Sequence, residues 1–370
     1  MIKVLNIISD SNIGGAGRCV LNFLKYYDRK NYDVKVVVPR GSLLIPEIVK
    51  LNTEYIEADN IAEKSFDILA INQLITIINN ENPDIVHTHG SLSGRIAARF
   101  CGKKVIYTRH SVFPVSKKIS RGIGKFLNKS VNEYLADKII AVAEAAKDNL
   151  TEGGISEKKI IVLLNGVEAV KPCTEEENNE TREKYGLSKD DFVVGIMARM
   201  EPYKGHKYLI DAAKILKGKG KNIKVLIIGT GGYEEELKKY TAEKNMNDTI
   251  IFTGFIKDVR RMLGVMDVQA NASYGTEATS LALLEGMSLG IPAVVSNYGG
   301  NPGVITSGEN GYIFKLKDSA DMAKYLEKLY DDKDTYEYMK KRALEIFGEK
   351  FTAQIYADNI CSVYKSVMKG

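Results

Sequence analysis

The sequence has few cysteines and no apolar segment of membrane-spanning length. Its four cysteines, Cys19, Cys101, Cys173 and Cys361, are scattered over 370 residues and form no Cys-x-x-Cys pair. This spacing supports neither a disulfide framework nor a zinc site, so a reducing compartment fits best. A membrane-spanning helix needs about 20 consecutive apolar residues, and no segment approaches that length. We therefore expect a cytoplasmic protein.

The N-terminal segment 1–15 lacks the features of a secretory signal. Its apolar stretch is short, Asp10 interrupts it, and no small-residue cleavage site follows. We interpret residues 3–9 as the first strand of a protein core.

Acidic residues are absent from one long stretch. Between Asp84 and Glu133 there is no Asp or Glu, but there are ten Lys or Arg residues. The first 168 residues carry 23 basic and 18 acidic residues, whereas the remainder carries 29 of each, so the net charge of +5 lies in the first half. Such a block attracts phosphates, acidic sugars or an anionic membrane surface, although a solvated basic face remains an alternative.

Short runs rich in Val and Ile alternate with helical segments in both halves of the chain. Continuous apolar strands separated by helices are typical of parallel sheets covered on both faces. The expected strands are 3–9, 34–38, 85–89, 104–108, 138–142 and 160–164, then 192–198, 225–229, 250–253, 268–272 and 293–296.

The polar segment 169–186 interrupts this alternation and is interpreted as a linker. The two βα series predict an α/β protein with two Rossmann-like, doubly wound domains that face each other across a cleft. We expect the domains at 1–168 and 187–348, and a C-terminal helix at 349–370 that can cross back to the first domain.

A glycine-rich turn follows the first predicted strand. Gly14, Gly15 and Gly17 permit close approach of the backbone to a ligand, and the helix N-terminus that follows suits a phosphate. The turn matches neither G-x-G-x-x-G nor the Walker A pattern, so it does not predict NAD or ATP binding. A flexible turn without a ligand is the alternative.

Three of the four histidines lie at the ends of two predicted strands. His87 and His89 alternate along one strand, so both should project from the same face. No nearby carboxylate completes a metal site, and we predict none. His110 lies in a polar loop and is a stronger candidate for a ligand contact than the other two.

Two cations flank a turn after the first strand of the second domain. Arg199 and Lys204 enclose Pro202, and Gly205 follows. The spacing lets both side chains converge on one anion, and a diphosphate has the two charged groups that require two donors. Two unconnected surface cations are the alternative.

The most specific segment is 274–292, which contains Glu277 and Glu285. Eight residues of helix rise about 12 Å, a separation that suits the hexose and the ribose of a nucleotide sugar. Backbone N–H groups of Thr279, Ser280 and Leu281, at the start of the helix, can bind a phosphate between them. An ordinary acidic helix surface does not explain a Glu within an apolar run.

In their order and spacing, these motifs resemble the GT4 family of retaining glycosyltransferases, which have the GT-B fold. The resemblance covers nearly the whole chain. It is carried by the glycine turn at 14–15, ValHisThrHis at 86–89, LeuAsnGlyValGlu at 164–168, ArgMetGluProTyrLysGlyHis at 199–206, IleGlyThrGly at 228–231, PheThrGlyPhe at 252–255, the E-x7-E spacing at 277–285 and the segment 292–302.

The resemblance implies a role for each candidate residue. Arg199 and Lys204 would hold the donor diphosphate and stabilise the leaving group. Glu277 would bind hydroxyls of the donor sugar and Glu285 the ribose diol. His110 would lie near the transferred sugar.

The remaining implied contacts are made by the backbone. Gly14 and Gly15 would approach the donor phosphates, and the backbone at Phe255 and Ile256 would contact the base. Ala278 and Thr279 replace the usual Gly and large apolar residue of the family, so the identity of the donor sugar stays open.

The expected reaction moves a hexose or an N-acetylhexosamine from a nucleotide diphosphate sugar to a hydroxyl of a glycan or lipid-linked acceptor. The product is expected to be a surface polysaccharide, glycolipid or related glycan. A UDP-sugar is the first expectation, GDP- and ADP-sugars are open, and no metal or other cofactor is expected. The alternatives are a nucleotide-sugar 2-epimerase and a non-catalytic sugar-nucleotide-binding protein. Nucleic-acid binding is disfavoured because residues 85–132 contain few aromatic side chains.

The segment 116–129 combines cations with an apolar stripe. At helical spacing one stripe is formed by Ile119, Ile123, Phe126 and Leu127. This pattern predicts contact with an anionic membrane, at the inner face of the bilayer, or with the acceptor. An amphipathic helix packed on its own domain is the alternative, and two glycines in the segment weaken any helix.

Overall fold

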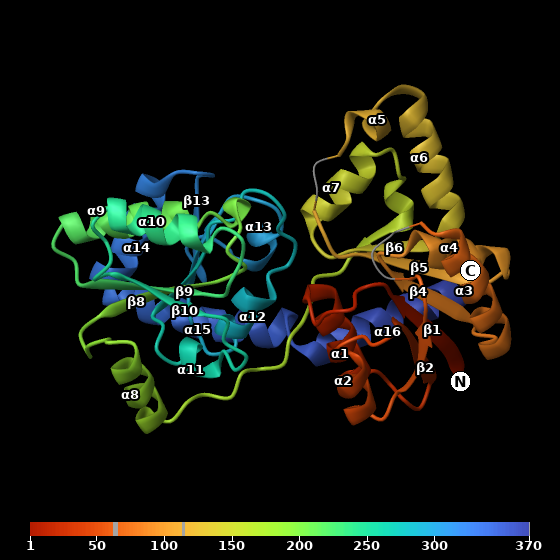
Figure 1. The fold of residues 1–370 in the computed structure, drawn as a ribbon, viewed down its shortest axis with the longest axis horizontal. Coiled ribbons are helices and arrows are strands. Elements are labelled where there is room, and N and C mark those ends of the chain that lie inside the picture. The colour runs from red at the N-terminus through yellow and green to blue at the C-terminus, as the bar shows by residue number, and fades with distance from the viewer. Residues whose placement is uncertain (62–65, 113–114, 370) are drawn as a thin grey trace. The chain divides into compact units, whose positions relative to one another are not determined.

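The computed structural model describes residues 1–61, 66–112 and 115–369. The chain divides into two compact units, each with its own sheet (Figure 1). Unit 1 comprises Met1–Val167 together with Thr352–Gly370, and unit 2 comprises Glu168–Phe351. Within the described residues, no helix is both long enough and apolar enough to cross a membrane.

Unit 1 is built on a seven-stranded parallel sheet with the order β3-β2-β1-β4-β5-β6-β7. Its strands are β1 (Ile2–Ile8), β2 (Tyr32–Pro39), β3 (Glu54–Ala58), β4 (Ile85–His89), β5 (Lys104–Arg109), β6 (Lys138–Ala141) and β7 (Ile160–Val162). Its helices are α1 (Gly15–Tyr26), α2 (Ile45–Lys50), α3 (Ile68–Glu81), α4 (Leu92–Phe100), α5 (Lys117–Ser120), α6 (Gly122–Leu135), α7 (Glu144–Glu152), the short η1 (Glu157–Lys159) and α16 (Ala353–Lys369).

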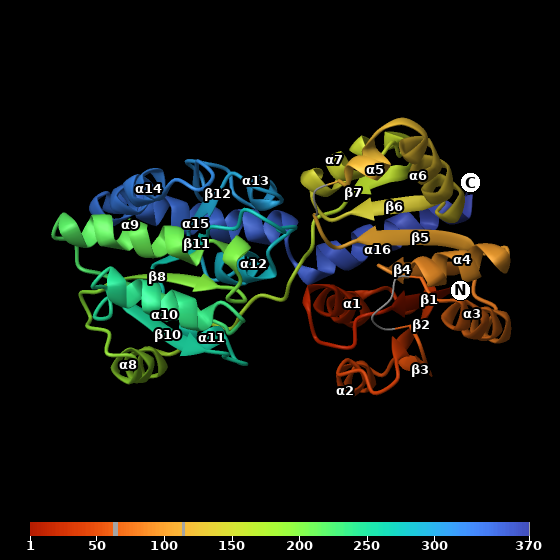
Figure 2. The same cartoon turned by 45° about the horizontal axis from the view of Figure 1, so that its top comes forward.

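Apolar side chains cover both faces of this sheet, as continuous Val/Ile strands require. Helices α3 and α4 pack on one face, where Leu74, Ile78 and Ala97 join the core. Helices α1 and α16 lie side by side (Figures 1 and 2), and Phe23 of α1 meets Tyr364 of α16 edge to face at 5.8 Å between ring centroids.

The C-terminal helix α16 is therefore an integral part of unit 1. A bridge between Val167 and Thr352 leads into it, and the hydroxyl of Tyr32 donates a hydrogen bond to the carbonyl of Cys361 at 2.8 Å. Tyr364 is completely buried.

Unit 2 is built on a six-stranded parallel sheet with the order β10-β9-β8-β11-β12-β13. Its strands are β8 (Phe192–Met197), β9 (Ile223–Ile228), β10 (Ile250–Gly254), β11 (Val268–Asn271), β12 (Ala293–Ser296) and β13 (Gly311–Phe314). Its helices are α8 (Glu175–Lys184), η2 (Pro202–Lys204), α9 (His206–Gly218), α10 (Glu234–Glu243), α11 (Arg260–Leu263), α12 (Leu281–Met287), α13 (Asn301–Val304), α14 (Ser319–Asp331) and α15 (Lys333–Lys350).

In both sheets the first three strands are added toward one edge, and the later strands are added on the other side of the first strand, toward the opposite edge. This is the doubly wound topology that the sequence predicts. The strand order reverses between β1 and β4 in unit 1, and between β8 and β11 in unit 2. Ligands of such sheets bind at this reversal, beyond the carboxyl ends of the strands.

Two strands escaped prediction. β3 lies at one edge of the sheet of unit 1 and has two Glu among its five residues. β13 lies at one edge of the sheet of unit 2 and has only four residues. Edge strands are short and partly polar, so they lack the long apolar run that marks a central strand.

The segment 116–129 does not form one helix. The chain is extended at Arg121, and Gly122 has a φ of 54°, so α5 ends and α6 begins there. The predicted apolar stripe is interrupted at this point. The alternative, in which this stripe packs on its own domain, does not hold for Ile123, Phe126 and Leu127, which are more than half exposed, at 79%, 68% and 56%.

Candidate active site

The centre of the candidate site is an ion pair at the strand reversal of unit 2. Lys204 lies in the turn after β8, and Glu277 lies in the loop after β11, the neighbouring strand. The Lys204 ammonium is 2.8 Å from the Glu277 carboxylate, and the two side chains are only 15% and 9% exposed. Two loops that are more than seventy residues apart thus place opposite charges together where the fold binds ligands.

Further hydrogen bonds fix this pair. The Ser273 hydroxyl donates to Oε2 of Glu277 at 2.7 Å, the same oxygen that Lys204 contacts. Lys204 also donates to the carbonyl of Thr276 at 3.3 Å.

Two glycines in left-handed conformations bring the loops together. Gly205 has a φ of 75°, and a Cβ at this position would lie 2.1 Å from the carbonyl oxygen of Ala272. Gly299 has a φ of 59°, and its Cβ would lie 2.1 Å from the carbonyl oxygen of Glu277. A side chain at either position would therefore push apart the loops that carry Lys204 and Glu277.

Arg199 lies five residues before Lys204 in the loop after β8. Its side chain is exposed, and its guanidinium donates to the hydroxyl of Tyr203 at 3.3 Å. The structure thus brings Lys204 onto Glu277, while Arg199 contacts a neighbouring tyrosine in its own loop.

Glu285 and the start of its helix are buried. Glu285 is 5% exposed within α12, between Leu284 and Met287, so an acidic surface helix is excluded. The helix begins at Leu281, and the hydroxyl of Ser280 accepts a weak hydrogen bond from the N–H of Leu283 at 3.5 Å. The predicted helix start is therefore confirmed, with Ser280 as the N-cap and Thr279 buried just before it.

The two residues predicted near the base follow β10. Phe255 is 74% exposed, whereas Ile256 packs against the core on one face of the sheet. The carbonyl of Gly254 accepts a hydrogen bond from the N–H of Gly229 at 2.9 Å, which joins the loops after β10 and β9.

The glycines of the first turn in unit 1 have different surroundings. Helix α1 begins at Gly15, with Gly14 as its N-cap. A Cβ at Gly17 would lie 2.8 Å from Leu44, and one at Gly14 would lie 2.9 Å from the Asp10 carboxylate. A Cβ at Gly15 would meet no atom within 4 Å, so only this glycine faces open space.

The three histidines of unit 1 cluster at the strand reversal, where each is hydrogen-bonded to a neighbouring side chain. His87 is bonded through Nδ1 to the Tyr364 hydroxyl at 2.8 Å and through Nε2 to the Thr108 hydroxyl at 2.7 Å. The rings of His87 and His89 lie 4.3 Å apart, which confirms that both project from one face of β4.

His89 is hydrogen-bonded to His110 and to Asn6. Its Nε2 lies 3.1 Å from Oδ1 of Asn6, and its Nδ1 lies 2.9 Å from Nε2 of His110. With Asn6 Oδ1 as the acceptor, His89 carries its proton on Nε2 and accepts the proton of His110 at Nδ1. Nδ1 of His110 is then an acceptor, and no described group is hydrogen-bonded to it.

Burial keeps these rings neutral. It lowers the pKa of His87 to about 3 and that of His110 to about 4, and it lowers the pKa of His89 well below its ordinary value. In unit 2, burial and then the charge of Lys204 lower the pKa of His206 to about 4. Within the described part of the chain, no group of three or more His, Cys, Asp or Glu side chains is placed to hold a metal ion.

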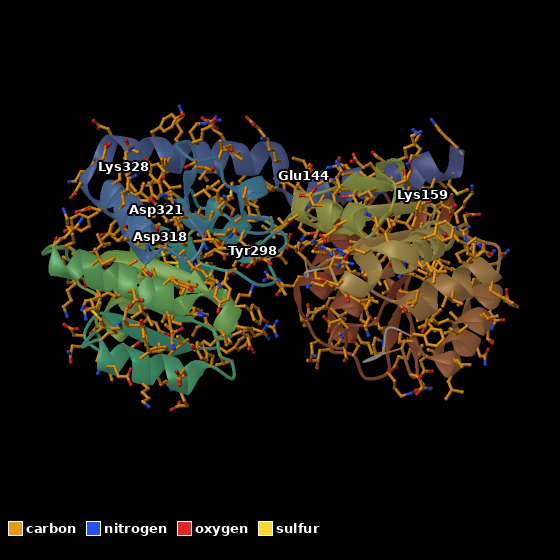
Figure 3. The ribbon with its side chains drawn as sticks, turned by 90° about the horizontal axis from the view of Figure 1, so that it is seen from above. Glu144, Lys159, Tyr298, Asp318, Asp321 and Lys328 are labelled. Carbon is orange, nitrogen blue, oxygen red and sulfur yellow. The ribbon has the colours of Figure 1, made fainter. Side chains whose placement is uncertain are left out.

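Several supporting residues were missed from the sequence. Ser273 holds Glu277, and Tyr298 (Figure 3) donates its hydroxyl to the carbonyl of Gly275 in the same loop. Ser273 lies four residues before Glu277 and could have been considered, whereas Tyr298 lies on the next strand-end loop and only the sheet order brings it near.

Two family models match this chain. One, described as glycosyltransferase family 4, matches residues 13–171, and the other, glycosyl transferases group 1, matches residues 177–345. The chain belongs to the group 1 glycosyltransferases. The predicted family and class of enzyme are therefore confirmed, and this group 1 glycosyltransferase has the predicted GT-B fold.

Known relatives and structures agree. The capsular polysaccharide biosynthesis glycosyltransferase CapM of Staphylococcus aureus is 25% identical, covering 99% of this chain and 98% of CapM. The Escherichia coli UDP-Gal:α-D-GlcNAc-diphosphoundecaprenol α-1,3-galactosyltransferase is 29% identical, covering 72% of this chain and 71% of that protein. The crystal structure of Anabaena HepE in complex with UDP superposes with a TM-score of 0.85 at 20% identity, covering 99% of this chain and all of that one.

Proposed function

We propose that this glycosyltransferase moves a hexose or N-acetylhexosamine from a UDP-sugar to a hydroxyl acceptor, with retention of anomeric configuration, in the synthesis of a surface glycan. The observation that carries the proposal is the buried Lys204–Glu277 pair at the strand reversal of unit 2. A cation and a carboxylate at that position provide one partner for a diphosphate and one for sugar hydroxyls.

The chemistry follows from how charge develops. As the glycosidic bond to the diphosphate breaks, negative charge grows on the leaving oxygen, and a fixed cation lowers the barrier because it needs no reorganisation. Lys204 has this role, and Arg199, exposed in the same loop, adds a second cation. Glu277 accepts hydrogen bonds from sugar hydroxyls, and Glu285 accepts them from the ribose.

Smaller roles are assigned to the remaining predicted residues. The backbone at Phe255 and Ile256 contacts the base, and the N–H groups of Thr279, Ser280 and Leu281 contact phosphate oxygens.

Three residues of unit 1 complete the proposal. Gly15 contacts the donor phosphates together with Gly14, which is consistent with the open space beside Gly15. His110 accepts a hydrogen bond from the transferred sugar at its unpaired Nδ1, while His89 fixes the orientation of its ring.

The choice of UDP and of a glycan acceptor is supported by the relatives. HepE structures are described as complexes with UDP and with UDP-glucose, and the E. coli enzyme is named for UDP-galactose and a diphosphoundecaprenol acceptor. CapM is named for capsular polysaccharide synthesis. We therefore include lipid-linked glycans among the acceptors.

A thermal-shift screen tests the donor site. UDP-sugars are expected to raise the melting temperature by about 5 °C or more at a hundred times Kd, because a ligand that binds only the folded state stabilises it by mass action. Lys204→Ala and Glu277→Ala are expected to abolish the shift. GDP- and ADP-sugars serve as comparisons, and release of free UDP rather than an epimerised donor identifies a transferase.

Matched variants separate lost binding from lost stability. Removing only one partner of a buried ion pair leaves an uncompensated charge, whereas the double variant Lys204→Met with Glu277→Gln leaves none. Lys207→Ala removes a half-buried lysine paired with Glu236 at 3.3 Å and should preserve the shift. If the Lys204 and Glu277 variants respond to UDP-sugar as the wild type does, the donor site lies elsewhere.

We also propose that unit 1 contacts an anionic bilayer through α5 and α6. Exposed apolar side chains lie beside cations there, and negatively charged lipid complements those cations at about 1 kcal/mol for each. The exposed apolar residues are Ile119, Ile123, Phe126 and Leu127, and the cations are Lys117, Lys118, Arg121, Lys125 and Lys129.

Vesicle flotation tests this contact. The protein is expected to float with phosphatidylglycerol vesicles but not with phosphatidylcholine vesicles, and Phe126→Asp should weaken binding about tenfold or more because a buried Phe contributes about 1.5–3 kcal/mol. Leu344→Asp, at an exposed leucine in unit 2, is the control. Equal flotation of the Phe126 and Leu344 variants would exclude this segment as the contact.

A further inference from the structure

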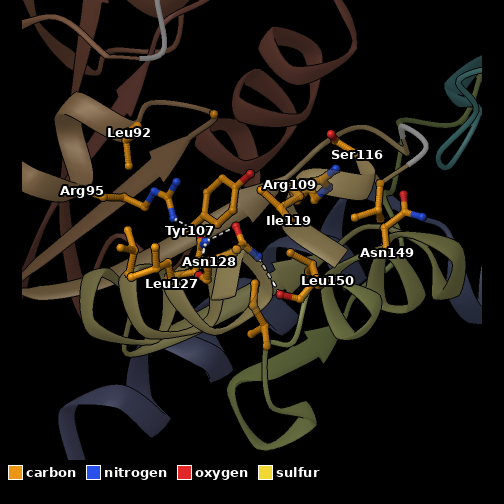
Figure 4. A pocket seen from close by; sticks show the side chains of 17 residues that line it. Leu92, Arg95, Tyr107, Arg109, Ser116, Ile119, Leu127, Asn128, Asn149 and Leu150 are labelled. Atoms are coloured by element: carbon orange, nitrogen blue, oxygen red, sulfur yellow. Dashed lines mark hydrogen bonds between the residues drawn. The ribbon is translucent and has the colours of Figure 1, made fainter. Parts of the chain in front are cut away.

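Unit 1 contains a pocket of about 680 Å³ that is lined by residues of this unit. It is lined by side chains of β5, α4, α5, α6 and α7 (Figure 4). Its volume lies within the range of small-molecule sites, about 300–1,000 Å³.

One wall of the pocket carries a buried cation. Arg95 is 7% exposed, and its guanidinium lies 4.2 Å from the ring centroid of Tyr107. It donates to Oδ1 of Asn132 at 2.8 Å, but its Nε is buried and has no partner in the described residues. Arg109, on the same strand as Tyr107, also lines the pocket.

No acidic side chain balances these cations in the pocket. Among the described residues that line it there is no Asp or Glu, and the other polar groups are neutral, including Asn128, Asn132 and Ser116. Burial and then the nearby charge of Arg109 lower the pKa of Arg95, with Tyr107 acting in the opposite direction. A buried cation without a counterion is costly, so an anion that enters the pocket gains a strong partner.

The cation is held in position by a chain of amides. Asn132 donates to Oδ1 of Asn128 at 3.1 Å, and Asn128 donates to the carbonyl of Gly153 at 2.7 Å, at the end of α7. Helix α6 is thus attached to unit 1 by asparagines, and its only buried residue is Leu135.

The opposite wall of the pocket is apolar. Leu127 and Val131 of α6 form this part of the lining, while Leu92 and Ile119 add apolar surface close to Arg95 and Arg109 (Figure 4). On α6, Leu127 lies one turn from Ile123, so the pocket wall continues directly into the exposed apolar stripe. A ligand with an anionic end and a hydrocarbon chain matches both walls.

The pocket also lies beside the histidine cluster. Gly90, which directly follows His89, lines it, and so does Arg109, which directly precedes His110. Both positions are at the carboxyl ends of adjacent strands, where ligands of this topology bind.

We infer that this pocket binds the phosphate or diphosphate of an amphiphilic acceptor, with Arg95 and Arg109 contacting the phosphate and the apolar chain lying along α6. That the ligand is the acceptor rests on the proposed function, whereas the binding itself does not depend on it.

Calorimetric titration without any sugar nucleotide tests the binding. Dodecyl phosphate, kept below its micellar concentration, is expected to bind the full-length protein, while inorganic phosphate and dodecyl maltoside bind much more weakly. Arg109→Gln should weaken dodecyl phosphate binding about 10- to 100-fold through loss of a charge-assisted contact. Leu127→Asp should weaken it too, and Lys103→Gln, at a lysine bonded to Asn82 outside the pocket, should not.

Each other outcome overturns the inference. Equal binding of inorganic phosphate would show a free-phosphate site, and equal binding of dodecyl maltoside would show apolar adsorption. Unchanged binding by Arg109→Gln and Leu127→Asp would place the ligand elsewhere. If Arg109→Gln loses only flotation on phosphatidylglycerol vesicles, the cation binds bulk lipid headgroups. A UDP-sugar shift that persists in any of these cases leaves the donor proposal intact.

Discussion

Replacing Glu277 with Gln is expected to lower kcat/KM by about 100-fold or more, while the fold of unit 2 is retained. Gln keeps the volume of the side chain and one oxygen that can accept from the Ser273 hydroxyl. It removes the negative charge that holds the Lys204 ammonium at 2.8 Å and that would accept charge-assisted hydrogen bonds from the donor sugar. Loss of one such preorganised contact typically costs about 10²–10³ in rate.

Steady-state transfer from a radiolabelled UDP-sugar, with circular dichroism to check folding, measures this effect. Glu236→Gln is a matched control, because Glu236 also pairs with a lysine, Lys207 of α9, but is exposed. Full activity of Glu277→Gln would show that the carboxylate serves only to hold the loop.

Acid is expected to destabilise unit 1 steeply below about pH 6.5. His87 and His110 have folded-state pKa values lowered to about 3 and about 4 by burial, whereas the unfolded chain takes up their protons near 6.5. Between those limits the unfolded state binds more protons, so the stabilising effect of the neutral rings, fully present above pH 6.5, is lost as pH falls. Each ring contributes a slope of up to about 1.4 kcal/mol per pH unit.

Hydrogen exchange at pH 7.5, 6.5 and 5.5, followed by mass spectrometry, resolves this loss by segment. Peptides from β4 and β5 should lose protection over this range more than peptides from unit 2, which contains only one buried histidine, His206. The comparison is clean because most carboxylates stay ionised above pH 5.5. His110→Gln, which cannot titrate, should flatten the slope in unit 1. Equal protection at pH 7.5 and 5.5 would contradict the neutral cluster.

The sequence predicts most of the fold because its central strands are long and apolar. Strands such as β8 and β9 are buried on both faces, and their sequences consist mainly of Val, Ile and Leu. The contact between Lys204 and Glu277 could also have been predicted from the sequence. Both residues follow strands, β8 and β11, that the doubly wound order places side by side.

The orientation of α6 could not be predicted from the sequence. Its apolar stripe indicates an amphipathic helix, but periodicity does not reveal whether protein or solvent covers that stripe. The orientation is determined by Asn128 and Asn132. Their hydrogen bonds to Gly153 and Arg95 turn the polar side of the helix inward. Such hydrogen bonds join segments that are far apart in the sequence, so no local sequence pattern predicts them. For the same reason the pocket beside these asparagines was not predicted.

The position of α16 in unit 1 has a consequence for biosynthesis. The first half of the chain leaves the ribosome early, yet Tyr364, which fills its core and contacts His87, is made only after the whole of unit 2. Unit 2 is a single continuous stretch and has all its residues while the tail is still being translated. The second unit can therefore reach its native state first. The first unit completes its core only after α16 has been made and has packed against it.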